Sequence, residues 1–148
     1  MLSRADVHSL KALLELGLEP CGWRSVAELA EAQQLPAAML EQLLLRLRRA
    51  GLVEARRGRR GGYRLARRPA EIALKDVLKA LGTDAKEAPP ALPGGGEGEA
   101  GEIVTRALRR RLDAALQREL ASITLEELLY DLRSSRAALS EEGGLLLG

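Results

Sequence analysis

Four leucines between residues 40 and 47 limit the fold more than any other feature of this sequence. Leu40, Leu43, Leu44 and Leu47 are spaced i, i+3, i+4 and i+7, which places them on one face of an α-helix. A glycine at position 51 suits the end of that helix. Because the chain has no phenylalanine and only 2% aromatic residues, its core must consist of leucine, valine, isoleucine and alanine. Such a core favours packed helices.

Length and composition restrict the class of protein. The chain has 148 residues, of which 46% are hydrophobic, so we expect one folded domain with an appendage. It has no apolar run long enough to span a bilayer and no signal peptide at its start, which predicts a cytoplasmic protein without a membrane partner. One cysteine excludes an intramolecular disulfide and any cysteine-rich zinc or iron–sulfur site supplied by a single chain. We therefore expect no metal and no cofactor.

Positive charge is concentrated in residues 46–68. This segment contains ten arginines and a single acid, Glu54. Within it, residues 52–57 and 63–66 have the pattern of two short strands, and residues 58–62 form a basic, glycine-rich turn between them. The sequence therefore predicts an arginine-rich β-wing directly after the leucine helix.

Three further helices complete the N-terminal part. The first begins after Ser3 and ends near Gly17, the second begins at the capping box 25–28, and the last opens at Pro69 and closes at Gly82. The expected apolar face of the first helix comprises Val7, Leu10, Leu13 and Leu14. Residues 1–82 are thus predicted to form a winged helix-turn-helix domain.

The remainder of the chain divides into three segments. Residues 83–101 are rich in proline and glycine and predict a flexible linker. Residues 102–136 predict a long helix and a terminal helix that ends at about Arg136, and residues 137–148 predict a frayed tail. The long helix carries an apolar stripe that needs a second surface against which it can be buried, and this predicts a dimerisation helix. The stripe comprises Leu108, Leu112, Ala115, Leu116 and Ile123. The expected fold class is mainly α with a small β-wing: a winged helix-turn-helix domain plus a long C-terminal dimerisation helix.

This order of elements is typical of DNA binding, with a helix in the major groove and a wing at a neighbouring groove or the backbone. The planar guanidinium fork of arginine suits phosphates and guanine edges. Gln42 can bond an adenine edge, and Glu41 can accept from a cytosine amino group. The candidate DNA-binding residues are Ser25, Ala38, Glu41, Gln42, Arg46, Arg49, Arg57, Arg59, Arg60, Gly61 and Gly62.

Short motifs along most of the chain resemble those of the Rrf2 family of bacterial regulators. They are Leu2-Ser3-Arg4, Leu10-Lys11-Ala12-Leu13, Leu40-Glu41-Gln42-Leu43, Arg46-Leu47-Arg48, Gly51-Leu52-Val53, Arg57-Gly58, Gly61-Gly62-Tyr63, Leu65-Ala66-Arg67, Ile72-Ala73-Leu74 and Ile123-Thr124-Leu125-Glu126-Glu127-Leu128. Each motif is weak alone, and their combination is specific. The resemblance implies dimers whose long C-terminal helix crosses to the partner, with Glu41 and Gln42 in the major groove and the wing near the minor groove.

Three departures from the family pattern affect function. Arg59 and Arg60 add two charges to a turn that in the family is usually Gly-Pro-Gly-Gly-Gly-Tyr, which should strengthen contacts to phosphates or a narrow groove. Leu45 replaces what is often a small polar residue, which leaves the operator sequence open. The three closely spaced cysteines of iron–sulfur members are missing from the linker, and Val7 and Lys11 cannot replace a ligand from the first helix.

For three isolated side chains we prefer a structural role to a role in ligand binding or sensing. His8 suits packing or surface exposure better than metal ligation. Cys21 is either a thiol sensor or, as its neighbours favour, a structural or incidental cysteine, because Arg24 is the only cation in residues 19–24 that could favour a thiolate. Trp23 is expected to be a core or interface anchor.

We expect a sequence-specific transcriptional regulator, a repressor, that binds double-stranded DNA as a homodimer without an iron–sulfur cluster. An unidentified small molecule or protein is its expected effector. The alternative is a dimeric adaptor whose winged domain binds a protein. An enzyme is disfavoured because one histidine, one isolated cysteine and no clustered inward carboxylates leave too few groups for an acid–base or metal site.

Overall fold

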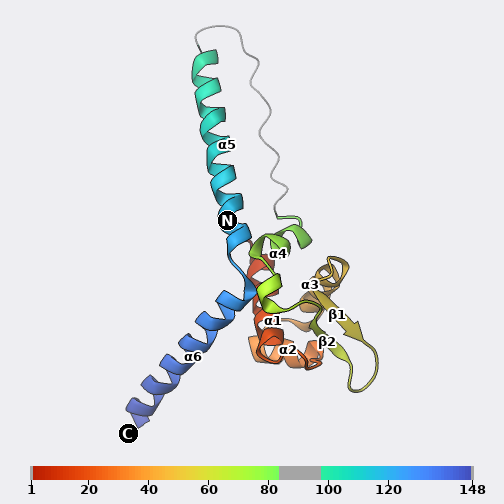
Figure 1. The fold of residues 1–148 in the computed structure, drawn as a ribbon. Helices are drawn as coiled ribbons and strands as arrows, with labels where there is room; N and C mark the ends of the chain where they lie inside the picture. Colours follow the sequence, from red (N-terminus) through yellow and green to blue (C-terminus); the bar gives the residue numbers. More distant parts are fainter. Residues whose placement is uncertain (1, 84–97, 148) are drawn as a thin grey trace.

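The computed structural model describes residues 2–83 and 98–147, with side chains through residue 142. Figure 1 shows a body formed by the N-terminal elements, from which two long helices project in different directions. The elements in chain order are α1 (Arg4–Leu18), α2 (Val26–Gln33), α3 (Ala37–Arg49), β1 (Val53–Arg56), β2 (Gly62–Leu65), the 3-10 turn η1 (Pro69–Glu71), α4 (Leu74–Ala80), α5 (Glu99–Ser122) and α6 (Leu125–Leu147). This is the mainly helical fold with a small wing that the sequence predicts.

Helix α3 and the hairpin pack on a leucine-rich core. Leu40, Leu44 and Leu47 have no exposed surface, and Leu43 is nearly as buried. Burial of a leucine side chain contributes about 1.5–3 kcal/mol to folding. Strands β1 and β2 pair antiparallel, with Val53 opposite Leu65. The leucine spacing therefore identified both the helix and its inward face.

The N-terminus of α1 is capped as predicted, but its buried face is different. Ser3 and Asp6 form a reciprocal capping box. Val7, expected inside, is 39% exposed, whereas Asp6 and Ser9 are fully buried. The reason is that Asp6 faces Thr83, which donates a hydrogen bond to its carboxylate. A hydrogen-bonded carboxylate can occupy an interior position that an apolar pattern assigns to valine.

The segment expected to be one helix from Pro69 to Gly82 is split. The 3-10 turn η1 comes first, extended backbone follows at residues 72–73, and α4 then begins. Gly82 follows α4 with a φ of 74°, a left-handed conformation that suits glycine at a helix end.

The extended residues before α4 connect the body to the two long helices. The backbone N–H of Leu74 donates to the carbonyl of Ile123, and the N–H of Leu125 donates to the carbonyl of Ile72, both at 2.8 Å. Leu125 and Leu129 of α6 are buried in the same core as α1. The junction between α5 and α6 is therefore anchored to the winged domain by main-chain hydrogen bonds.

The expected start of the long helix was slightly late. Helix α5 begins at Glu99 instead of Glu102, because residues 99–101 continue the helix without a proline to stop it. Of the expected linker 83–101, residues 84–97 lie outside the described residues.

The expected end of the last helix was wrong. Helix α6 continues through Leu147, where the sequence suggested an end near Arg136 and a frayed tail at residues 137–148. Residues after Arg136 are mostly alanine, leucine, serine and glutamate, which tolerate helix well, and no proline interrupts them. The two glycines at 143 and 144 cost only about 1 kcal/mol each relative to alanine. They do not stop the helix.

Candidate nucleic-acid interface

The outward face of α3 is polar and accessible. The leucines of the opposite face fix the helix on the core, so its orientation follows from their burial. The sequence-predicted residues Ala38, Glu41, Gln42, Arg46 and Arg49 are all exposed. The structure thus brings these five positions together on one solvent-facing surface of one helix.

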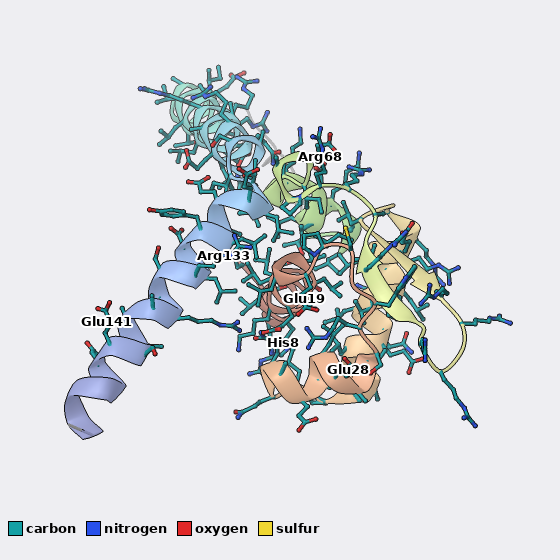
Figure 2. The ribbon with its side chains drawn as sticks, turned by 60° about the horizontal axis from the view of Figure 1, so that its bottom comes forward. His8, Glu19, Glu28, Arg68, Arg133 and Glu141 are labelled. Atoms are coloured by element: carbon teal, nitrogen blue, oxygen red, sulfur yellow. The ribbon has the colours of Figure 1, made fainter. Side chains whose placement is uncertain are left out.

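The wing presents three arginines to solvent. Arg57, Arg59 and Arg60 are exposed in and beside the turn between β1 and β2. Figure 2 shows nitrogen-tipped side chains extending from this loop away from the body. Arg56 differs, because its guanidinium donates a 2.7 Å hydrogen bond to the carbonyl of Arg60 and so supports the turn.

Gly61 and Gly62 are required by close backbone contacts. A Cβ on Gly61 would overlap the carbonyl of Arg56, and one on Gly62 would overlap the carbonyl of Arg24. Gly62 also has a φ of 133°, which side chains rarely permit. The structure therefore gives both glycines a role in closing the wing and docking it on the body.

Arg24 forms an isolated antiparallel bridge to β2 of the wing. Its N–H donates to the carbonyl of Tyr63 at 2.9 Å, and the N–H of Tyr63 donates to the carbonyl of Arg24 at 2.7 Å. The next residue, Ser25, caps α2: its Oγ accepts from the N–H of Glu28 at 3.1 Å and donates to the Glu28 carboxylate at 3.2 Å. Figure 2 labels Glu28 on α2. The predicted DNA-binding residue Ser25 thus has a capping role as well.

Trp23 lies against the wing, an arrangement that the sequence reasoning missed. The guanidinium carbons of Arg56 and Arg64 lie 4.6 and 4.4 Å from its ring centroid. Both distances suit cation–π contacts. Arg64 also forms an ion pair with Glu54. The sequence predicts only a general anchoring role for Trp23, because no local pattern links it to residues more than 30 positions later.

The arginines of segment 46–68 therefore fall into two groups. Arg56, Arg64 and Arg68 are engaged within the protein, Arg68 through an ion pair of 2.7 Å with Glu71. The others form no ion pair with any residue that the structure describes; they are Arg46, Arg48, Arg49, Arg57, Arg59, Arg60 and Arg67. Apart from Arg67, which follows β2, these arginines lie on α3 and in the turn of the wing, where they outnumber the exposed acid Glu41. Such an excess of positive charge suits a polyanion.

An exposed apolar stripe runs along the surface of α5. Leu108, Leu112 and Leu116 are 52%, 60% and 44% exposed, and Ala115 is exposed as well. Ile123, predicted as part of this stripe, is placed differently: it is half-buried at the end of α5, where its carbonyl accepts from α4. Its position follows from the turn between α5 and α6, which ends the helical periodicity before residue 123.

An apolar cavity of about 460 Å³ lies between α4 and the C-terminal half of α5. Leu74 and Leu78 line it from α4, and Leu116 and Leu120 from α5. Leu116 therefore belongs both to the exposed stripe and to the wall of the cavity.

Comparison with known proteins identifies the family. The Rrf2 model, described as an iron-dependent transcriptional regulator, matches residues 2–131. The chain belongs to the Rrf2 family. It is accordingly a helix-turn-helix transcriptional regulator and not an enzyme.

Rrf2 relatives share most of the chain. A helix-turn-helix-type transcriptional regulator of Synechocystis is 44% identical over 141 residues, which cover 95% of each protein. The regulator IscR of Cereibacter sphaeroides is 35% identical over 118 residues, which cover 76% of each.

Solved Rrf2-like structures have the same fold. IscR of T. potens has a TM-score of 0.71 and 30% identity, over 91% of this chain and 90% of that one. CymR, described as the global cysteine regulator of B. subtilis, has a TM-score of 0.72 and 30% identity, over 88% of this chain and 96% of that one. The winged helix-turn-helix architecture is thus common to these proteins.

The donor groups of this Rrf2 protein do not fit an iron–sulfur cluster held by one chain. Such clusters are bound by several cysteine thiolates, with histidine in some. The sequence has one cysteine, Cys21, and one histidine, His8. Cys21 is exposed in the loop after α1, and no group of three potential metal ligands occurs in the described parts of the chain. In those parts, no helix has the length and hydropathy to cross a membrane.

Proposed function

We propose that this Rrf2-family regulator binds a palindromic DNA site as a homodimer, without an iron–sulfur cluster, and represses transcription from that site. In this proposal, residues 1–82 contact DNA and residues 102–136 form the dimer. The observation that supports it most directly is the position of the exposed arginines that form no ion pair within the described residues, because all but Arg67 lie on α3 or in the turn of the wing. A helix in the major groove with a wing beside it uses those two surfaces.

The α5 stripe supports the dimer. Three leucines are about half exposed on a helix that projects from the body, and covering them with another surface would lower the free energy of the protein in water. Because Leu116 joins the stripe to the cavity between α4 and α5, a second copy that covers the stripe also covers the mouth of the cavity. Two copies related by a two-fold axis suit a palindromic site.

Repression is the simplest outcome of such binding, since a dimer on a promoter blocks access to it. The effector, a small molecule or a protein, stays a prediction.

Selection of bound duplexes from a random pool with metal-free protein tests this function. Enrichment of a palindrome without metal supports it, and the enriched site then serves for titrations by fluorescence anisotropy. In vitro transcription from a promoter that contains the site should fall as protein is added. Equal binding to all duplexes, together with retention of an acidic protein, would instead indicate the adaptor.

The double variant Arg59→Ala/Arg60→Ala tests the wing. Each phosphate contact contributes about 0.9 to the slope of log K against log salt concentration. Loss of two contacts from each wing of a dimer should therefore reduce the slope by up to about 4. The matched control is Lys79→Ala/Arg133→Ala, which removes two exposed cations from α4 and α6 and should leave the slope unchanged. Tight binding that is indifferent to salt would contradict the proposal.

A further inference from the structure

Glu15 is a buried carboxylate on α1 that contacts three other parts of the chain. Its side chain is only 6% exposed. Its Oε1 accepts from Nε2 of Gln33, at the end of α2, at 2.7 Å and from Nη2 of Arg136, on α6, at 2.8 Å. Its Oε2 lies 3.7 Å from Nη1 of Arg24. One buried charge therefore connects α6 with the segment that precedes α2.

Arg24 connects Glu15 with the wing. Its backbone pairs with Tyr63 of β2, and its Nε donates to Glu28 at 3.2 Å. The preceding residue, Trp23, stacks against Arg56 and Arg64 of the two strands. We therefore expect a displacement of the Arg24 backbone to be transmitted to β2 through this bridge.

The two ion pairs of Glu15 differ in geometry. Arg136 is within hydrogen-bond distance, whereas Arg24, at 3.7 Å, is not. A buried carboxylate that loses one cationic partner interacts more strongly with the remaining one, since an unpaired charge in the interior is costly. Withdrawal of Arg136 should therefore draw the Arg24 guanidinium toward Glu15.

We propose that Glu15 is a positioning residue for the wing, and that Arg136 makes the position of the wing depend on the placement of α6. A signal or a partner that displaces α6 then changes DNA affinity without touching the DNA-binding surface. The effect on DNA affinity rests on the function proposed above, whereas the coupling between α6 and the wing base does not.

The only tryptophan in the chain, Trp23, reports on the wing base directly. Arg136→Ala should shift its fluorescence emission and change its quenching by iodide, with the helical circular dichroism and melting profile checked in parallel. The matched control is Arg133→Ala, an exposed arginine three residues earlier on α6 that forms no ion pair within the described residues. Figure 2 labels Arg133 on this helix.

DNA titrations then test the consequence. Coupling between separate sites typically changes affinity by about 5–150-fold. We expect Arg136→Ala to weaken duplex binding within that range at fixed salt. The salt slope should stay unchanged, because Arg136 does not contact phosphate in this proposal. Arg136→Lys, which keeps the charge, should recover part of the affinity.

A double-mutant cycle separates positioning from general destabilisation. Glu15→Gln removes the charge and keeps an acceptor for Gln33, so the double variant Glu15→Gln/Arg136→Ala should bind DNA no more weakly than the weaker single variant. Additive losses, or an Arg136→Ala protein with the Trp23 signal and affinity of Arg133→Ala, would overturn the proposal. If the wild type binds no duplex, the proposed function fails. The fluorescence of Trp23 alone then tests the coupling between α6 and the base of the wing.

Discussion

The hydroxyl of Thr83 donates a 2.8 Å hydrogen bond to Oδ1 of Asp6, a residue 77 positions earlier. The other carboxylate oxygen accepts from the N–H of Ser3 at 2.7 Å. Asp6 has no exposed surface. This contact fastens the end of the winged domain to its first helix.

Thr83→Val should lower the free energy of unfolding by about 1–3 kcal/mol, because it deprives a buried carboxylate of a partner. Chemical denaturation at one fixed protein concentration measures the loss. The matched control is Thr105→Val, whose exposed hydroxyl donates only to a carbonyl of its own helix at 3.0 Å. That change should stay within about 0.5 kcal/mol. Equal losses in the two variants would show that the contact with Asp6 contributes nothing specific.

Gly62→Ala should disturb the wing more than Gly58→Ala. Both glycines have positive φ, of 133° and 109°, which costs an alanine about 1–3 kcal/mol. A Cβ at Gly58 meets nothing within 4 Å, whereas one at Gly62 overlaps the carbonyl of Arg24. Thermal unfolding and Trp23 fluorescence should both distinguish the variants, and indistinguishable behaviour would argue against the close contact.

Gln42→Ala should relax sequence preference at one position of each half-site. A bidentate base contact is worth about 1–3 kcal/mol of discrimination. Titration against duplexes altered at each position in turn locates the effect. Arg48→Ala, on α3 but outside the predicted set, should change affinity for all these duplexes by the same factor. A Gln42→Ala protein that keeps its full preference would remove Gln42 from the interface.

Leu108→Glu/Leu112→Glu should produce a monomer, because it places two charges on the two most exposed leucines of the α5 stripe. Size-exclusion chromatography with light scattering gives the mass directly. Ala114→Glu places a charge at an exposed position of α5 outside the stripe and should leave the mass unchanged. A wild-type monomer at micromolar concentration would contradict the proposed dimer.

The hydrogen bond and charge of Arg68 hold the pKa of Glu71 below its ordinary value. Because the pKa is lower in the folded state, the pair stabilises the fold above the unfolded-state pKa, and this contribution is lost as pH falls through the folded pKa. Arg68→Gln should raise the pKa of Glu71 in an NMR titration of its carboxyl carbon. Arg67→Gln should raise it less, since Arg67 acts on Glu71 through its charge alone, without a hydrogen bond. Equal shifts would exclude the specific pair.

The local sequence pattern was sufficient to predict a residue's environment where that environment depends on the residue's own helix or turn. The spacing of Leu40 and its three companions identified α3, and the glycines at 58 to 62 identified the turn of the wing. The exposure of Gln42 followed from the same periodicity, because it lies opposite the leucines.

The local sequence pattern failed to predict a residue's environment where residues far along the chain determine it. Asp6 and Glu15 look like surface acids in the sequence, yet both are buried, with partners 77 and 121 residues away. The stacking of Trp23 on the wing has the same origin. The predicted end of α6 was wrong for another reason. The glycines after residue 142 disfavour a helix only weakly, so their presence did not determine where α6 ends.

The main-chain hydrogen bonds that join residues 72 and 74 to residues 125 and 123, at the turn between α5 and α6, have a geometric consequence. Helix α5 has 24 residues and is therefore about 36 Å long, so a rotation of about 5° at that turn displaces its far end by about 3 Å. Because the turn is held through backbone groups, a side-chain substitution there does not itself remove either hydrogen bond. In the proposed dimer the angle at this turn determines the separation of the two wings, and with it the spacing of the half-sites that the protein can bridge.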